Sequence, residues 1–180
     1  MKGFFDNLAE LLKFTNSHRV IDVGCGEGHI TNFLVQRLPN AEVKGVDVAK
    51  DIIKIARTNY PLLHFEEESI YSLPYSTGYY DLVVSCEVLE HLEQPDRALR
   101  ELLRVCHECV ILSVPREPIW CISNLIRGKY LRNLGNTPGH IQHWSQRGFI
   151  DFVSQFGTIE LIKSPFPWTM VLLKKEEVIL

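Results

Sequence analysis

Three closely spaced glycines early in the chain form a turn that could hold a small anionic or zwitterionic ligand. Residues 19–23 are predicted to form a short buried strand that runs directly into Gly24-Cys25-Gly26-Glu27-Gly28. A glycine turn between a strand and a helix exposes backbone N–H groups, and its missing Cβ atoms let a ligand lie close. Gly28 comes one residue too early for the dinucleotide pattern Gly-x-Gly-x-x-Gly. The spacing therefore disfavours a nicotinamide-dependent dehydrogenase.

Two aspartates lie near this turn. Asp22 directly precedes it, and Asp47 ends the next predicted strand, about twenty residues beyond the turn. A carboxylate at Asp47 can accept hydrogen bonds from both hydroxyls of a ribose, and the alternative is a cap for the helix that follows. Asp22 either contacts the ligand or orders the turn as a structural carboxylate. The glycine turn favours ribose binding at Asp47, and the role of Asp22 stays open.

Glu87, Glu90 and His91 form a second group of reactive side chains, directly after the fourth predicted strand. Their spacings of three and four residues predict that they share one face of a helix. His91 is suited to act as a base if the reaction removes a proton from a hydroxyl. The alternative is that His91 caps or packs a short helix.

Alternating strand and helix patterns position these groups. Buried apolar runs predict five parallel strands, at residues 19–23, 42–46, 63–66, 82–85 and 110–114. Helical periodicity predicts helices at residues 4–12, 30–38, 49–59, 95–105 and 145–156. A connection too short for a crossover helix joins two final strands, so these strands must pair antiparallel, at residues 158–162 and 169–173. The pattern predicts a doubly wound α/β sheet.

Length and composition limit what the protein can be. At 180 residues and 46% hydrophobic content, the chain has room for one domain with a sizeable core, predicted to span residues 1–180. The 19 basic and 22 acidic residues give a net charge of −3, which argues against general binding to nucleic acid. No apolar run approaches the roughly 18 residues of a membrane span, and we expect no secretory signal. Five scattered cysteines argue against a disulfide framework, so we expect a cytoplasmic protein.

Five segments of the chain resemble, in order, the successive motifs of the class I S-adenosylmethionine-dependent methyltransferases. These segments are residues 20–28, 45–47, 73–75, 80–85 and 87–92. The chain is most similar to the small-molecule branch that is sometimes called type 11. The resemblance implies S-adenosylmethionine as the cofactor and a Rossmann-like, mostly parallel seven-stranded sheet with an antiparallel last strand.

The resemblance also implies where the cofactor binds. Its methionine part would lie above the glycine turn, its ribose against Asp47 and its adenine ring beside Ile70. Recognition of the adenine amino group would fall to Glu68 or Ser69, because this chain has serine where the family often has aspartate. The full set of expected cofactor contacts is Asp22, Gly24, Cys25, Gly26, Gly28, Asp47, Val48, Glu68, Ser69, Ile70 and Cys86.

Glu87 would line the reaction side of the cofactor, and we expect the catalytic candidates to be Glu87, His91 and His140. Methyl transfer from a sulfonium depends on alignment and on exclusion of water more than on a catalytic triad. Glu87, Glu90, His91 and His140 also resemble the metal-binding residues of small-RNA terminal 2′-O-methyltransferases, which would suit magnesium or manganese. Because Glu-His-Leu at this point also resembles metal-free members of the small-molecule branch, we expect no metal ligands.

An insertion at residues 115–144 is predicted to cover the acceptor side of the site. Residues 118–150 contain no Asp or Glu, and apolar residues alternate at roughly helical spacing with Arg127, Lys129, Arg132 and Arg147. This pattern predicts a lid for an anionic or lipid-like acceptor, with peripheral membrane contact as a further expectation. The alternative is an ordinary amphipathic helix that packs on the sheet and exposes a solvated basic face.

The function expected from these residues is methyl transfer from S-adenosylmethionine to a small-molecule acceptor, without a nucleic-acid partner. One alternative is a metal-assisted RNA 2′-O-methyltransferase, which would require a divalent metal and act on RNA. Another alternative is a noncatalytic module that binds the cofactor and regulates a partner protein, with no turnover on any acceptor.

Overall fold

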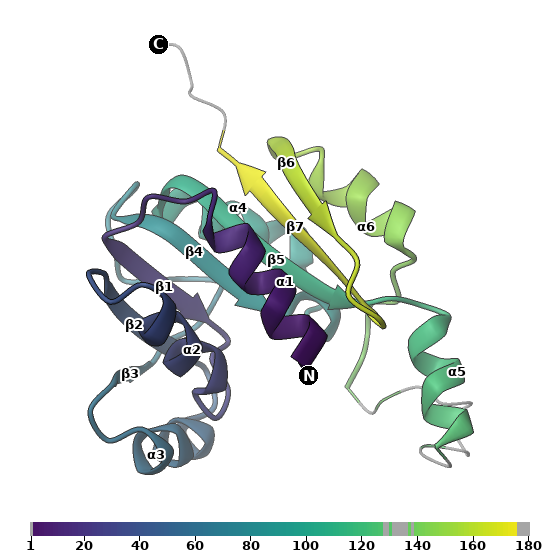
Figure 1. Ribbon diagram of the computed structural model, residues 1–180, viewed down its shortest axis with the longest axis horizontal. Helices are drawn as coiled ribbons and strands as arrows, with labels where there is room; N and C mark the ends of the chain where they lie inside the picture. Colours follow the sequence, from purple (N-terminus) through teal and green to yellow (C-terminus); the bar gives the residue numbers. More distant parts are fainter. Residues whose placement is uncertain (1, 128–129, 131–136, 138, 176–180) are drawn as a thin grey trace.

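A mixed sheet of seven strands forms the centre of the described part of the chain (Figure 1). The computed structural model describes residues 2–127, 130, 137 and 139–175. The strand order is β3-β2-β1-β4-β5-β7-β6. The strands are β1 (Arg19–Val23), β2 (Glu42–Asp47), β3 (His64–Glu67), β4 (Tyr80–Cys86), β5 (Cys106–Pro115), β6 (Thr158–Lys163) and β7 (Trp168–Lys174).

The pairing of these strands confirms the predicted doubly wound α/β sheet. The neighbouring pairs from β3 to β5 are all parallel, and β7 runs antiparallel to both β5 and β6. The strand order reverses between β1 and β4, with β2 and β3 on one side and β5 on the other. Ligands of open α/β sheets bind beyond the carboxyl ends of the strands at such a reversal. The residues that follow β1, β2 and β4 are therefore the ones placed for chemistry.

Helices cover both faces of the sheet (Figure 1). They are α1 (Lys2–Leu12), α2 (His29–Arg37), α3 (Lys50–Asn59), α4 (Pro95–Val105), α5 (Ile119–Ile126) and α6 (Gln146–Val153), with a short 3-10 helix η1 (Leu89–His91) after β4. Leu82 and Val84 of β4 join the core that contains α1 and α2, whereas Val83 joins the core that contains α4 and α6. Because successive strand residues point to opposite faces, burial of both faces requires an uninterrupted apolar run at β4.

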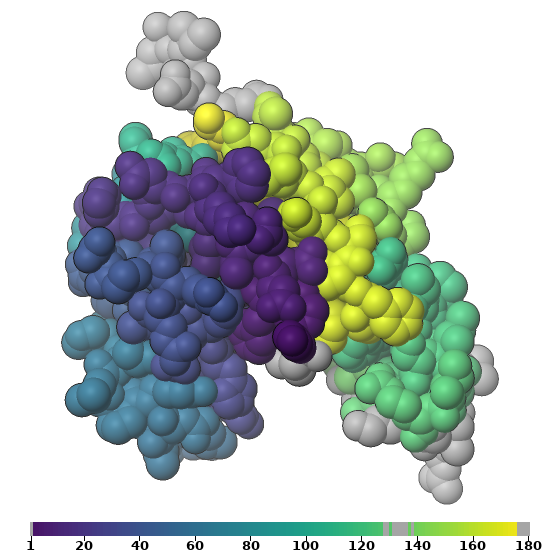
Figure 2. Space-filling view, in the orientation of Figure 1, coloured from purple at the N-terminus to yellow at the C-terminus, as the bar shows by residue number. Residues whose placement is uncertain are grey.

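α5 begins the predicted lid and leaves the sheet just after β5. Figure 2 shows it as a green projection beside the yellow connection between β6 and β7. Lys129 and Arg132, two of the predicted basic lid residues, lie outside the described residues. Across the described ranges, no helix is both long and apolar enough to span a membrane.

Asp22 is a buried carboxyl group on β1 and is only 1% exposed. Thr31 Oγ1 of α2 donates a hydrogen bond of 2.7 Å to Asp22 Oδ2, so Asp22 ties the helix to the strand. Within the described chain, Asp22 Oδ1 has no hydrogen-bond partner. Burial raises the pKa of Asp22 to about 7, because the charged form loses its hydration. This environment favours the structural interpretation of Asp22.

We expect Asp22→Asn to flatten the pH dependence of the free energy of unfolding. Between the unfolded-state pKa of about 3.9 and the folded-state value, the native protein binds more protons than the unfolded chain. Asp22 therefore lowers the free energy of unfolding as the pH rises from about 4 to 7, by up to about 4 kcal/mol in total. Asparagine cannot ionise and still accepts from Thr31.

Urea unfolding at pH 5 and pH 8 measures this difference. The Asp22→Asn variant should gain stability relative to the parent at the higher pH. The exposed Asp51→Asn variant serves as the matched control and should follow the parent. If Asp22→Asn shows the same pH dependence as the parent, Asp22 does not carry this buried-carboxyl penalty.

Candidate cofactor and acceptor site

The glycine turn is tied to the end of β2. The N–H groups of Gly24 and Cys25 both donate to the carbonyl of Val46, at 2.8 and 2.9 Å. Gly24, Gly26 and Gly28 have φ angles of 79°, 54° and 87°, in the left-handed region that favours glycine. The turn therefore keeps a conformation that most other residues would adopt only at a cost.

Packing explains two of these glycines and leaves the third open to a ligand. A Cβ atom at Gly24 would collide with the side chain of Val88, and one at Gly28 would lie 2.7 Å from the Phe65 ring. A Cβ atom at Gly26 would meet no atom within 4 Å. Gly26 is thus the glycine of the turn whose missing side chain faces free space.

Asp47 supports the same turn from β2. Its Oδ2 accepts a hydrogen bond of 3.0 Å from Gly26 N–H, and its Oδ1 accepts one of 2.9 Å from Ala49 N–H. The second bond orders the chain as it enters α3. Asp47 is not the cap of α3, because the N-cap residue of this helix is Ala49. Its carboxylate orders the turn before the helix and also borders the cavity described next.

One cavity, of about 320 Å³, lies on the β2 side of the glycine turn and is called the nucleoside cavity below. Among the residues predicted to contact the cofactor, those that border it are Gly24, Gly26, Asp47, Val48, Glu68 and Ile70. Ser69 is not among its lining residues, and the Oγ of Ser69 accepts a hydrogen bond from Tyr71 N–H. The geometry thus brings Glu68, and not Ser69, to this cavity.

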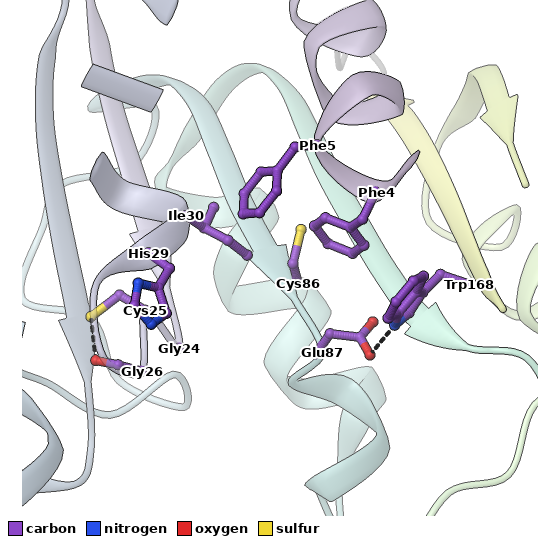
Figure 3. Close-up of a pocket in the computed structure, with 10 residues that line it drawn as sticks. All are labelled: Phe4, Phe5, Gly24, Cys25, Gly26, His29, Ile30, Cys86, Glu87 and Trp168. Atoms are coloured by element: carbon purple, nitrogen blue, oxygen red, sulfur yellow. Dashed lines mark hydrogen bonds between the residues drawn. The ribbon is translucent and has the colours of Figure 1, made fainter. Parts of the chain in front are cut away.

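A second cavity, of about 290 Å³, lies on the other side of the turn and is called the inner cavity (Figure 3). Phe4 and Phe5 of α1, together with Trp168 of β7, form walls that sequence analysis did not assign to the site. Their aromatic character was visible in the sequence, but their position depends on packing between distant segments. The predicted site residues that border this cavity are Gly24, Cys25, Gly26, Cys86 and Glu87.

Glu87 borders both cavities and has an unusual backbone. Its φ is 61°, so the chain turns sharply after β4, and η1 begins only at Leu89. Ser113 Oγ donates to Glu87 Oε1 at 2.9 Å, and the Trp168 indole N–H donates to Oε2 at 2.6 Å (Figure 3). Burial raises the pKa of Glu87 to about 7. Left-handed backbone at a non-glycine residue is characteristic of functional sites.

The predicted helical face for Glu87, Glu90 and His91 is wrong. The left-handed turn at Glu87 separates it from the one-turn helix η1 that contains Glu90 and His91. Glu87 instead faces Ser113 and Trp168. The spacing argument failed because tertiary hydrogen bonds from β5 and β7 determine the backbone there.

Glu90, His91 and His140 come together as a separate group, with possible ligand atoms all within 4.8 Å of one another. Glu90 is 1% exposed, and neither its Oε2 nor His140 Nδ1 has a hydrogen-bond partner in the described chain. His91 Nδ1 lies 2.9 Å from the carbonyl oxygen of Gly139. Burial raises the pKa of Glu90, and burial with the nearby His91 lowers the pKa of His140 to about 4.

The other predicted site residues differ in their placement. Asp22 and Gly28 border neither cavity. Cys25 and Cys86 border the inner cavity, and burial raises the pKa of both thiols, so neither is a thiolate nucleophile at neutral pH. In the lid, Trp120 of α5 stacks on His140 with ring centroids 6.1 Å apart.

A glycine turn after β1, a carboxylate at the end of β2 and an antiparallel β7 define the fold class of the class I methyltransferases. A family described as a methyltransferase domain matches residues 21–113. The chain belongs to this family, and the resemblance to S-adenosylmethionine-dependent methyltransferases of class I is confirmed.

Individual relatives cover only part of the chain. A malonyl-[acyl-carrier protein] O-methyltransferase of Halorhodospira halophila is 36% identical over 105 residues, which are 56% of this chain and 36% of that protein. A trans-aconitate 2-methyltransferase of Rhodopseudomonas palustris is 46% identical over 52 residues, which are 29% of this chain and 20% of that protein. This chain spans between 22% and 44% of the length of three curated relatives that it matches.

Solved structures with low sequence identity to this chain share its fold. The crystal structure of magnesium protoporphyrin IX methyltransferase from Synechocystis PCC 6803, with bound SAH, is 17% identical. Its TM-score is 0.72, and the match covers 96% of this chain and 82% of that one. The shared feature is the fold of the whole described sheet with its flanking helices.

Proposed function

We propose that the protein transfers a methyl group from S-adenosylmethionine to a small-molecule acceptor. The observation that carries this proposal is that Gly24, Gly26 and Glu87 border both cavities. One ligand can therefore extend from the Asp47 side of the glycine turn to the Trp168 side. Membership of the methyltransferase-domain family supports the same conclusion.

The nucleoside of S-adenosylmethionine fits the nucleoside cavity. Asp47 would accept hydrogen bonds from the ribose hydroxyls, while Val48 and Ile70 offer apolar surface to the adenine ring. Glu68 borders this cavity, so we assign it to the adenine amino group. The methionine end would cross Gly26 and reach the inner cavity.

Glu87 is the residue that we assign to the reacting centre. When bound, the cofactor supplies a methyl group on a positively charged sulfur, which is already activated for displacement. Ser113 and Trp168 hold the Glu87 carboxylate in one orientation at the boundary of the two cavities. If the acceptor is a hydroxyl, Glu87 would take its proton as the new O–CH₃ bond forms. His91 borders the nucleoside cavity and is the alternative base, with His140 as its packing partner.

The acceptor that we propose is a small molecule with negative charge. Two relatives are named for acidic or acyl substrates, malonyl-[acyl-carrier protein] and trans-aconitate. The predicted lid at residues 115–144 has more basic than acidic residues. Among its described residues, Arg127 directly follows α5. Ile122 and Ile126 of α5 are exposed, so contact of this helix with an anionic membrane surface belongs to the same proposal.

We expect Asp47→Ala to weaken binding of S-adenosylhomocysteine by about ten- to a hundredfold, because charge-assisted hydrogen bonds to the ribose are lost. Calorimetric titration measures both affinities. Asp51→Ala is the control, since Asp51 lies exposed at the start of α3 and should leave the affinity unchanged. Equal affinity of Asp47→Ala and the parent would remove Asp47 from the cofactor site.

Turnover distinguishes an enzyme from a regulatory module. Labelled S-adenosylmethionine should transfer its methyl group to at least one member of a panel of small organic acids. Cofactor binding without transfer to any member would contradict the catalytic part of the proposal and favour the noncatalytic module.

A second candidate is methyl transfer assisted by a divalent ion. The specific observation in its favour is the group of Glu90, His91 and His140. Within the described ranges, Glu90 Oε2 and His140 Nδ1 have no hydrogen-bond partner. The Gly139 carbonyl beside His91 Nδ1 would leave Nε2 to bind the ion, as partners of ligating histidines commonly do. Carboxylate and imidazole ligands suit manganese or magnesium, and such an ion would orient an acceptor oxygen.

On this second candidate, the parent binds Mn²⁺ at this group and His140→Ala binds it about tenfold more weakly or worse, because one ligand is lost. Electron paramagnetic resonance of free Mn²⁺ measures binding without reference to activity. His107→Ala, on the exposed start of β5, is the control. No Mn²⁺ binding by the parent, or equal binding by His140→Ala, would reject the metal-assisted candidate.

A further inference from the structure

A third cavity, of about 580 Å³, lies between α5 and the connection from β6 to β7. We call it the outer cavity. Figure 1 shows α5 beside this connection at the edge of the molecule, and Figure 2 shows both at the surface. Its volume lies in the range of small-molecule sites in proteins.

The outer cavity is apolar and carries one positive charge among its described lining residues. Ile126 and Phe166 border it and are 82% and 70% exposed, although large apolar side chains are usually buried. Arg127 is the charged residue of the lining in the described chain. Its guanidinium donates to Ser123 O and Asn124 Oδ1, which holds it at the carboxyl end of α5.

Two contacts connect the outer cavity with the site already described. Trp168 borders both the outer and the inner cavity, and its indole N–H donates to Glu87. Trp120 borders the outer cavity and stacks on His140. The ring centroids of His140 and His91 are 4.9 Å apart. A molecule in the outer cavity is therefore separated from Glu87 by the side chain of Trp168. Three side chains, those of Trp120, His140 and His91, connect it with the nucleoside cavity.

The direction of α5 sets the order of chemical groups along the outer cavity. Trp120, at the start of the helix, is the end near His140, and Arg127 follows seven residues later. At a rise of about 1.5 Å per residue, the Cα atom of Arg127 lies about 10 Å farther along the helix axis than the Cα atom of Trp120. Ser123 lies between these two residues on the lining, and the exposed apolar side chains of Ile126 and Phe166 also border the cavity. The cavity thus offers a tryptophan ring at the end near the site and a cation at the far end.

We propose that the outer cavity binds the apolar chain of an elongated acceptor that carries an acidic group at the end remote from the methylated atom. Trp120, Ile126 and Phe166 would cover the chain, Arg127 would pair with the acid, and Trp168 would direct the other end to Glu87. The inference rests on the proposed function, because it names the acceptor of that same site. It assigns specificity to the hairpin residues Phe166 and Trp168 as well as to α5.

Binding of ω-hydroxydodecanoate, below its micelle concentration, tests this inference. The probe has an acid at one end and a hydroxyl at the other, and Trp120 and Trp168 make their fluorescence a readout. Arg127→Gln should weaken binding about five- to tenfold, since one exposed charge pair is lost. Ile126→Asp should weaken it at least as much, because it adds a like charge to the apolar wall. Both side chains are exposed, so the fold should tolerate these changes.

Arg147→Gln is the matched control, because Arg147 lies exposed on α6 and borders none of the three cavities described. It should bind the probe as the parent does. Dodecanol, which lacks the acid, should bind the parent and Arg127→Gln equally. Equal binding of ω-hydroxydodecanoate by the parent and Arg127→Gln would overturn the inference. The inference would also be overturned if the parent bound dodecyltrimethylammonium as tightly as ω-hydroxydodecanoate. Binding of the parent only to micelles or vesicles of these molecules would overturn it too.

Titration of S-adenosylhomocysteine into the same variants separates this inference from the proposed function. Arg127→Gln should bind the cofactor product as tightly as the parent. If the parent binds the cofactor product but Arg127→Gln binds ω-hydroxydodecanoate as tightly as the parent does, the outer-cavity inference fails and the methyltransferase function stands. If the parent does not bind the cofactor product, the proposed function fails whatever the probe does.

Discussion

The hydrogen bonds between the glycine turn and the end of β2 are the constraint on which the site depends. Val46 accepts two N–H groups of the turn, and Asp47 accepts a third, from Gly26. These bonds keep the backbone of the turn in its left-handed conformation. Gly26 has no side chain that would separate the two cavities. The candidate site therefore depends on the β1–β2 pair as well as on the turn.

The acceptor side depends on segments that are distant in the chain. Glu87 follows β4, Ser113 lies on β5 and Trp168 begins β7, and two hydrogen bonds join them. Phe4 packs edge-to-face on Trp168 with ring centroids 5.2 Å apart, so α1 closes the same region. The antiparallel β7 makes this possible, because it delivers its first residue to the edge where the parallel strands end. The final hairpin thus contributes a side chain to the candidate site as well as strands to the sheet.

Local patterns predicted most of the fold and several of the residues that border the two cavities. Apolar runs and glycine spacing predicted the parallel strands, the turn and Asp47, because these features depend on neighbours in the sequence. Trp168 could not be predicted, since its place in the site depends on pairing between β5 and β7. The helical face at Glu87 was wrong for a related reason, because hydrogen bonds from two distant strands override helical spacing there. Hydrogen bonds between distant segments hold His140 near His91, since Ile141 and Gln142 both donate to the Glu90 carbonyl.

The central claim is that one cofactor molecule occupies both cavities across Gly26. Nuclear magnetic resonance of ¹⁵N-labelled protein during titration with S-adenosylhomocysteine tests it most directly, because the three tryptophan indole signals are readily separated. The Ile70 backbone amide reports on the nucleoside cavity, and the Trp168 indole N–H reports on the inner cavity. We predict that both signals shift with the same saturation curve. A shift at Ile70 with an unchanged Trp168 signal would contradict the claim, because the ligand would then be confined to one side of the turn.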